Sequence, residues 1–326
     1  MAQDGIITSN QPDGLVYAGK VAYTYKGTLP EGTNIVLAEG TLGIADSAFS
    51  GCIGLTSVTI PNSVTNIGDY AFYGCYWLMS LKVYRETPLV ISPETFEGAY
   101  SNVTLYVTVG CKSAYRSADV WKDFWSIEEY YPTGSIFKAM TPQGIEMQFR
   151  VVSEEDNTVE TYAYQDGEEY VTAIDQAIEG DLIIPAEIEY NGWTYRVVGI
   201  GSNSFRECMG ITSASLPAGI QYIDEGAFRL ATSLKAVNIP EGVEALGAHT
   251  FNGCPLTTVI LPSTLKRITG TYAFRYGNIK NENAACSFIA NMKRPCTLDE
   301  GSIYGMEYYD LYVPKGRKEF YLSEPI

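Results

Sequence analysis

Few residues of this chain could carry out catalysis, and none of them stands in a recognisable catalytic pattern. His249, in LGAHTF, is the only histidine. A Ser-His-Asp or Cys-His site needs a histidine beside its nucleophile, and a metal site built from several histidines is excluded by the count. His249 occupies a position that Tyr70 and Gly226 fill elsewhere in the repeat described below, so we expect it to be a variable, exposed residue.

The seven cysteines also give no pattern for metal or redox chemistry. No pair has the two-residue gap typical of zinc and dithiol sites. Two of the four that share one repeat position, Cys208 and Cys254, lie two coils apart, about 10 Å at normal strand spacing, which is too far for a disulfide. Pairing of Cys52 with Cys75, in adjacent coils, stays open, but we expect small buried thiols at a tight turn. The cysteines are Cys52, Cys75, Cys111, Cys208, Cys254, Cys286 and Cys296.

Two further patterns of catalytic proteins are incomplete in this sequence. The stretch YRVVGIGSNS, 195–204, has Ser204 where a dinucleotide-binding loop needs its third glycine, and no amphipathic helix follows. Carboxylates are plentiful enough for a glycosidase pair, but no local context singles one out. We therefore predict a protein that is not an enzyme and has no catalytic residues, no cofactor and no bound metal.

The charge and composition of the chain exclude some classes of binding partner. The chain has 326 residues, 46% of them apolar, and a net charge of −16. Such an acidic surface repels nucleic-acid phosphates and anionic lipid heads, so we expect neither partner. The long uncharged run 47–68 is rich in Ser, Thr, Asn, Gly and Pro and does not predict a membrane span.

The elements that must position any site are set by a repeat. Phenylalanines recur at steps of 23 residues, with one step of 24, and a fixed period of this size indicates stacked structural repeats. Seven of the twelve phenylalanines take part: Phe49, Phe72, Phe96, Phe205, Phe228, Phe251 and Phe274.

Each repeat begins with a short strand that ends at a proline. LTSVTIP, 55–61, has Leu55, Val58 and Ile60 as its apolar set, and ITSASLP, LKAVNIP and LTTVILP are its counterparts. Proline cannot donate to a sheet, so it closes the strand. No single coil can bury its own apolar face, and stacking therefore predicts a solenoid with the phenylalanines stacked inside it.

These residues resemble the BspA-type leucine-rich repeat family. Its pattern, L-x-x-V-x-I-P-x-x-V-x-x-I-G-x-x-A-F-x-x-C, is visible in LTSVTIPNSVTNIGDYAFYGC, 55–75, and again over 220–254 with Ala231 at the cysteine position. The resemblance covers about two thirds of the chain. It implies a leucine-rich-repeat solenoid, mostly β with short turns, 3-10 segments and a few short helices, and it implies a bacterial secreted or surface protein.

A larger duplication predicts two tandem arrays, each starting with a β cap. LYVTVGCKSAYRS (105–117) is matched by LYVPKGRKEFYLS (311–323). After the first copy, ADVWKDFWSIEEY is interpreted as a short helix and an aromatic plug, with Trp121 and Phe124 covering the open end. We expect a first array over 1–132, a β-hairpin cap over 133–180, and a second array over 181–326 whose C-terminal cap is incomplete.

Two surfaces are candidates for binding. The solvent side of the strands predicts a row made of Thr59, Lys82, Ser215, Asn238 and Ile260. This row is mostly small and polar and lacks the Trp, Tyr and Arg that dominate protein interfaces. The second candidate is an aromatic patch in YNGWTY, where Asn191-Gly192 predicts a turn; its members are Tyr190, Trp193 and Tyr195, which either stack on a ligand or pack inside a hairpin.

We therefore expect a monomeric extracellular or cell-surface protein that binds an extracellular macromolecule, a host glycoprotein or matrix protein, and mediates adhesion. Two alternatives stay open. The chain is a spacer without its own ligand, or it binds glycans through exposed tyrosine and tryptophan.

Overall fold

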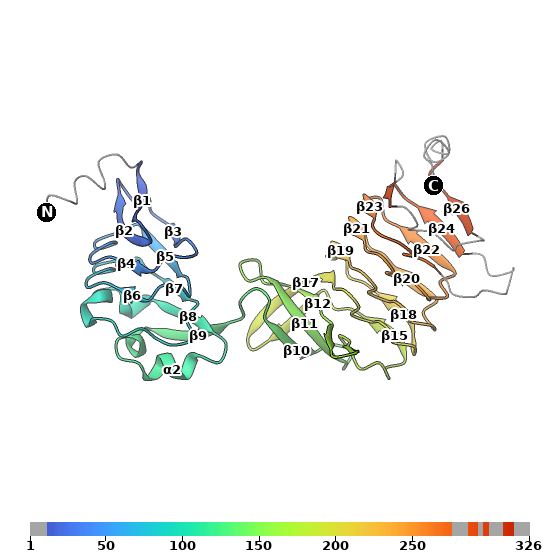
Figure 1. Cartoon of the computed structure of the whole chain (residues 1–326), viewed down its shortest axis with the longest axis horizontal. Coiled ribbons are helices and arrows are strands. Elements are labelled where there is room, and N and C mark those ends of the chain that lie inside the picture. Colours follow the sequence, from blue (N-terminus) through green and yellow to red (C-terminus); the bar gives the residue numbers. More distant parts are fainter. Residues whose placement is uncertain (1–11, 276–285, 293–295, 300–308, 316–326) are drawn as a thin grey trace. The chain divides into compact units, whose positions relative to one another are not determined.

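The computed structural model describes residues 12–275, 286–292, 296–299 and 309–315. The chain divides into two compact units, Met1–Tyr131 and Pro132–Ile326. Both are stacks of short strands joined by turns with little helix (Figure 1). The predicted mostly-β solenoid is therefore confirmed.

The first unit encloses its core between two sheets in the described residues. One is a parallel sheet with the order β3 (Thr33–Val36), β5 (Leu55–Ile60), β7 (Ser80–Val83), β8 (Thr104–Thr108), β9 (Ser126–Tyr130). The other has the order β1 (Gly14–Ala18), β2 (Val21–Lys26), β4 (Gly43–Ile44), β6 (Asn66–Ile67). Because β1 and β2 pair antiparallel and β2 then starts the parallel ladder, this hairpin caps the first coil.

The phenylalanines stack as the period predicts. In the first unit Phe72 lies between Phe49, at 5.2 Å and 8° between ring planes, and Phe96, at 4.9 Å and 4°. In the second unit Phe205, Phe228, Phe251 and Phe274 stack in the same way, with ring centroids 5.1–5.5 Å apart.

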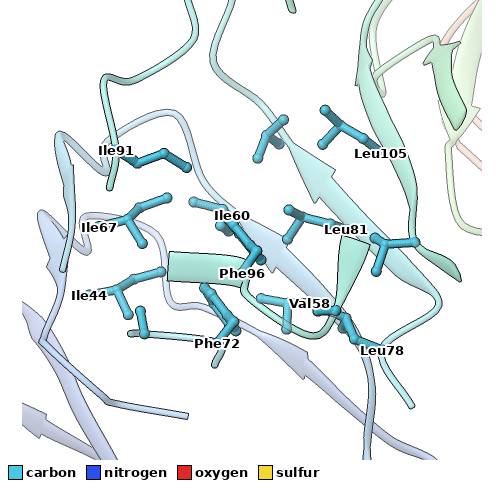
Figure 2. Close-up of a cluster of buried hydrophobic side chains, with 14 of the residues drawn as sticks. Ile44, Val58, Ile60, Ile67, Phe72, Leu78, Leu81, Ile91, Phe96 and Leu105 are labelled. Atoms are coloured by element: carbon cyan, nitrogen blue, oxygen red, sulfur yellow. The ribbon is translucent and has the colours of Figure 1, made fainter. Parts of the chain in front are cut away.

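The first stack lies inside an apolar cluster built by both sheets of its unit. Figure 2 shows Phe72 and Phe96 among side chains of the two sheets and of the following loop: Ile44, Val58, Ile60, Ile67, Leu78, Leu81, Ile91 and Leu105. One coil thus supplies one layer of the core, and the next coil covers it.

One turn position of the coil has left-handed backbone in every regular repeat. Ser47 and Tyr70 in the first unit, and Asn203, Gly226, His249 and Tyr272 in the second, all have φ between 56° and 63°. The shared geometry confirms that His249 is equivalent to Tyr70 and Gly226. However, His249 is half-buried rather than exposed, because its ring lies 5.4 Å from that of Tyr272.

The aromatic residues expected to cover the C-terminal end of the first unit do so, but the short helix expected beside them lies earlier in the chain. The helix α2 (Lys112–Ser117) precedes the segment in which we expected it, and 118–130 holds the 3-10 turn η3 (Trp121–Asp123) and strand β9. Val120 has φ 72°, which interrupts any helix there. The short 3-10 turns η1 (Pro93–Phe96) and η2 (Tyr100–Asn102) precede this end.

The buried Trp121 and Phe124 rings cover the last phenylalanine of the stack. Their centroids lie 6.0 and 5.1 Å from that of Phe96. The indole Nε1 of Trp121 donates to the carbonyl of Leu89 at 2.7 Å, so its polar atom is satisfied.

The second unit repeats this plan over its described residues. A parallel sheet has the order β15 (Gly180–Ile183), β18 (Ile211–Ser215), β20 (Ala236–Asn238), β22 (Thr258–Leu261), β24 (Cys286–Ala290), β26 (Tyr309–Tyr312). The opposite sheet has the order β10 (Ile136–Met140), β11 (Glu146–Ser153), β12 (Thr158–Thr161), β17 (Trp193–Ile200), β19 (Tyr222–Ile223), β21 (Ala245–Leu246), β23 (Arg267–Ile268), β25 (Thr297–Leu298), with β16 (Glu187–Tyr190) paired to β17.

The second unit opens with β10, which pairs antiparallel with β11, and the expected hairpin around an acidic turn, β11–β12, follows. The small hairpin β13 (Tyr164–Asp166) and β14 (Glu169–Val171) follows. The cap reaches past residue 180, because the hairpin β16–β17 belongs to the same sheet. The incomplete C-terminal cap expected after the second LYV segment lies at 316–326, outside the described residues.

A buried polar network joins this cap to the first coils. Glu160 accepts hydrogen bonds from the Arg150 guanidinium, with Nε at 2.8 Å, and from the Tyr222 hydroxyl at 3.0 Å. The pKa of the Tyr222 hydroxyl is raised, first by burial and then by Glu160. A charged carboxylate that is almost fully buried needs such partners, so the network fixes the cap on the array.

Candidate binding surface

The solvent side of the six-stranded sheet carries three of the five residues predicted for the row, Ser215, Asn238 and Ile260, whereas Thr59 and Lys82 belong to a sheet of the first unit. Strand register places Ser215 beside Asn238, and Asn238 beside Ile260. The same register adds members on both sides that the sequence pattern did not give. The complete outer row is Ile183, Ser215, Asn238, Ile260, Ile289 and Tyr312, and all six side chains are exposed.

The outer row is more apolar than the sequence analysis expected. Ile183 and Tyr312, at its two ends, are 52% and 56% exposed, and Ile260 and Ile289 are also exposed large apolar side chains. The expectation of a row without Tyr, Trp or Arg is therefore wrong, since Tyr312 belongs to it. Its six strands span about 24 Å at a spacing of about 4.8 Å.

A second row of small polar side chains runs alongside. It consists of Asp181, Ser213, Thr258 and Ser287, with the small apolar Ala236 between Ser213 and Thr258. The Asp181 carboxylate accepts hydrogen bonds from the hydroxyls of Ser213, at 2.6 Å, and Thr212, at 3.2 Å. Together the two rows make a face with an apolar segment at Ile260, Ile289 and Tyr312 beside a mostly polar second row.

The edge strand of this sheet, β15, forms hydrogen bonds with a side chain along its open edge. The Gln143 amide nitrogen donates to the Asp181 carbonyl at 2.5 Å, and its amide oxygen accepts from the Ile183 backbone N–H at 3.0 Å. The side chain thus pairs with β15 as a neighbouring strand would. Because an unpaired edge invites strand addition, we place any partner on the face of this sheet rather than on the β15 edge.

The corresponding row of the first unit is more polar. Register places Val36, Thr59, Lys82, Tyr106 and Glu128 side by side. Lys82 is half-buried, with its Nζ 4.7 Å from the centre of the Tyr130 ring, and Lys112 pairs with Glu128 at 2.9 Å. This face is therefore more occupied by its own contacts than the outer row.

The second predicted surface, the aromatic patch of YNGWTY, does not form as a unit. The turn is as expected, since Asn191 and Gly192 have φ of 48° and 82° between paired Tyr190 and Trp193. Tyr195, however, is only 2% exposed, and Tyr190 stacks on Phe137 at 4.3 Å and 11°. Tyr195 as part of an exposed patch is therefore wrong, because alternation along β17 turns its ring into the cap.

The cysteines of the shared turn position are free thiols in the structure, and three of the four are buried. The thiols of Cys75 and Cys254 donate to the carbonyls of Phe49, at 3.1 Å, and Phe228, at 2.9 Å, in the preceding coil. Burial raises the pKa of both thiols to about 12. These thiols stay protonated and pack as part of the core.

The single histidine, His249, forms a side-chain hydrogen bond within its own turn. Asn252 Nδ2 lies 2.8 Å from His249 Nδ1, and an amide nitrogen can only donate, so Nδ1 accepts. Burial, followed by the nearby Arg229, lowers the pKa of His249. Among the described residues, no group of three His, Cys, Asp or Glu side chains is arranged to hold a metal, and no helix is long and apolar enough to cross a membrane.

Two of the outer-row residues that sequence reasoning missed carried a readable signal. Ile183 lies in LIIP and Tyr312 in LYVP, and both fit the strand-ending pattern of VTIP, 58–61. Ile289 had no such signal, because its strand is not closed by a proline at that position.

Coils of about 23 residues, proline-closed parallel strands and a stacked phenylalanine core define a leucine-rich-repeat solenoid. The sequence matches the family described as BspA type Leucine rich repeat region in six copies, over residues 22–118 and 194–291. The chain belongs to this family. Among curated proteins, none matches it.

Several solved structures resemble this chain at low sequence identity. A leucine rich cell surface protein from Faecalibacterium prausnitzii is 15% identical, with 96% of this chain and 98% of that chain covered and a TM-score of 0.38. A leucine-rich repeat protein from Bacteroides capillosus is 17% identical, over 51% and 93%, with a TM-score of 0.32. One from Bacteroides ovatus is 12% identical, over 93% and 71%, with a TM-score of 0.27.

Proposed function

We propose that this is a non-enzymatic binding protein, secreted or held at the bacterial cell surface, and that its second unit binds an extracellular protein through the outer row. Family membership supports a repeat scaffold, a class whose stacked coils present extended surfaces. The partner class we favour is a host or matrix glycoprotein, bound for adhesion.

The observation that carries this proposal is the exposure of four large apolar side chains along one line. Ile260, Ile289 and Tyr312 are adjacent in the outer row, whereas Ile183 lies at its other end, beyond Ser215 and Asn238. All four are exposed. Contiguous exposed apolar surface on a soluble protein marks interaction sites. The polar row beside it supplies hydrogen-bonding groups that distinguish one partner from another.

The outer row fits a protein partner better than a sugar. Isoleucine offers no flat π-face for stacking on a sugar ring, and the one aromatic ring of the row, Tyr312, lies at its end. An apolar segment such as Ile260, Ile289 and Tyr312, bordered by polar residues, is the pattern of a protein interface core and rim.

The test is a binding screen of the intact chain against immobilised matrix glycoproteins and a glycan array at physiological salt. Ile260→Asn and Ile183→Ser change the outer row to residues that its neighbours Asn238 and Ser215 already carry, so the fold should be kept. We expect saturable binding to a glycoprotein, weakened by each variant. A folded wild-type chain that binds nothing would favour a spacer, and binding to glycans alone would favour the glycan alternative.

A further inference from the structure

A second exposed apolar cluster lies in the first unit, at the N-terminal ends of its main strands. Its members, which we name the strand-start patch, are Ile53, Tyr76, Trp77, Met79 and Trp125. Trp77 and Trp125 are 65% and 75% exposed, and the other three are also mostly exposed. The outer row, by contrast, lies on the face of a sheet in the other unit.

The members of the patch lie before β5, β7 and β9, so they come from adjacent or next-but-one coils of one sheet. The backbone N–H of Met79 donates to the carbonyl of Thr56 in the preceding coil. The backbone N–H of Thr104, in the following coil, donates to the carbonyl of Met79. Trp125 immediately precedes β9, which is two strands from β7 and thus about 10 Å away. Val103, which precedes β8 between them, is buried, so Trp125 stands two strands away from Met79 on this side of the unit.

The repeat itself does not require these aromatic side chains. In other coils the positions of Tyr76 and Trp77 are held by Ile53-Gly54, Met209-Gly210 and Thr232-Ser233. The turn has the same hydrogen bond with either pair. The backbone N–H of Leu78 donates to the carbonyl of Cys75, and that of Leu234 donates to the carbonyl of Ala231. A coil therefore closes equally well with Thr-Ser in this place, and the Tyr-Trp pair is an addition to the scaffold.

Carboxylates surround the patch. The backbone N–H of Gly74 donates to Glu97, and a Cβ at the next residue, Gly98, would lie 3.1 Å from the Tyr76 ring, so Glu97 borders that ring. Asp123 stands two residues before Trp125. On the other side, exposed Glu31 precedes β3 as Ile53 precedes β5.

Electrostatic coupling supports this placement. The pKa of Tyr100 is raised by burial first and then by Asp123, Glu97 and Glu94, so these carboxylates converge on one part of the surface. Lys122, next to Asp123 in the chain, is paired with Asp119 at 2.6 Å. The border of the patch is therefore acidic, in a chain whose net charge is already −16.

We propose that the strand-start patch is a second binding surface, one that takes a polypeptide segment presenting apolar side chains next to arginine or lysine. The rings of Trp77 and Trp125 bind the apolar groups and hold cationic groups over their faces. Glu31, Glu97 and Asp123 pair with the remaining positive charges and steer the partner to the surface. This surface is independent of the outer row.

The test uses the intact chain with 15N-labelled tryptophan, which gives four indole signals because the chain has four tryptophans. The probe is a panel of synthetic peptides in which Arg or Lys alternates with Leu or Trp, and a matched panel has Glu in place of the basic residue. We expect basic peptides to shift the signals of Trp77 and Trp125. The signal of Trp121, which is buried, and that of Trp193, in the other unit, serve as internal controls.

The variants follow the repeat. Tyr76→Thr with Trp77→Ser copies Thr232-Ser233 and should weaken peptide binding at least about tenfold, as expected for hot-spot aromatics. The matched control, Met209→Thr, alters an exposed apolar residue of the second unit at the same position and should leave binding unchanged. Affinity should also fall several-fold between about 50 and about 500 mM NaCl, because exposed charges are screened.

Three results would overturn the proposal. One is equal shifts with the Glu panel, and another is no shift of Trp77 or Trp125 with any peptide. The third is a response to oligosaccharides or zwitterionic lipid vesicles without a response to basic peptides, since this would assign the patch to a different ligand. None of these results bears on binding through the outer row.

Discussion

Replacing Phe72 by alanine tests the stacked core most severely. The ring is fully buried and lies between two others, at 5.2 Å from Phe49 and 4.9 Å from Phe96, with planes within 8° of parallel. Phe→Ala in a core costs about 3–5 kcal/mol of unfolding free energy. Two aromatic contacts, each worth about 0.5–1.5 kcal/mol beyond area burial, place Phe72→Ala at the upper end of that range.

The assay is urea and thermal unfolding of the first unit, followed by tryptophan fluorescence and circular dichroism. For a unit of this size we expect the melting temperature to fall by roughly 12–25 °C, from about 4–5 kcal/mol at about 3–5 °C per kcal/mol. Phe49→Ala is the matched control. Within the phenylalanine stack its ring contacts Phe72 alone, so it should cost about 1 kcal/mol less.

A loss below about 1 kcal/mol for Phe72→Ala would refute the reasoning. So would an equal or larger loss for Phe49→Ala, since the cost would then not depend on the number of stacked neighbours.

Three further predictions concern single positions, each measured by denaturant unfolding. Gly247→Ala should cost roughly 2–3 kcal/mol, because its Cβ would lie 2.4 Å from a backbone nitrogen of the preceding coil, whereas Gly219→Ala, with its nearest atom at 3.6 Å, should be tolerated. His249→Asn should remove a pH dependence of stability. The pKa of His249 is lowered in the folded state, so wild-type stability is lost as pH falls below about 6.5, when protonation breaks the hydrogen bond from Asn252. A variant whose stability had the same pH profile as wild type would contradict this. Lys82→Thr should cost no more than about 1 kcal/mol, the value of one cation–π contact at a part-exposed site, and a larger loss would show that its stem is part of the core.

The fold could be predicted wherever the sequence repeats itself. The 23-residue period of Phe49, Phe72 and their equivalents predicts the length of each coil, the position of its strand and the stacking of the rings. It does so because every coil must bury the same face against the next. The cap hairpin β11–β12 was also predictable, since two alternating segments flank an acidic turn.

The departures occur where local sequence and tertiary packing disagree. Residues 118–125 have a pattern compatible with a helix, but burying Trp121 on Phe96 requires the turn at Val120, so the helix forms earlier, at 112–117. Tyr195 is typical of an exposed aromatic residue next to a turn, yet alternation along a long strand buries it.

The binding surfaces were only partly predictable. The middle of the outer row follows from repeat position, but Ile289 is placed there by strand pairing alone. Trp77 and Trp125 lie in turns before strands, where exposure depends on how neighbouring coils close. The 23-residue period by itself does not distinguish an exposed ring at such a place from a buried one.

The central claim is that the outer row binds an extracellular protein, and the most direct measurement is the dissociation constant of the best glycoprotein from the screen for wild type and Ile260→Asn. An exposed apolar residue in the middle of an interface is worth about 1–2 kcal/mol or more, so we expect an increase of at least about fivefold with unchanged unfolding. An unchanged dissociation constant for a fully folded Ile260→Asn chain would contradict the account.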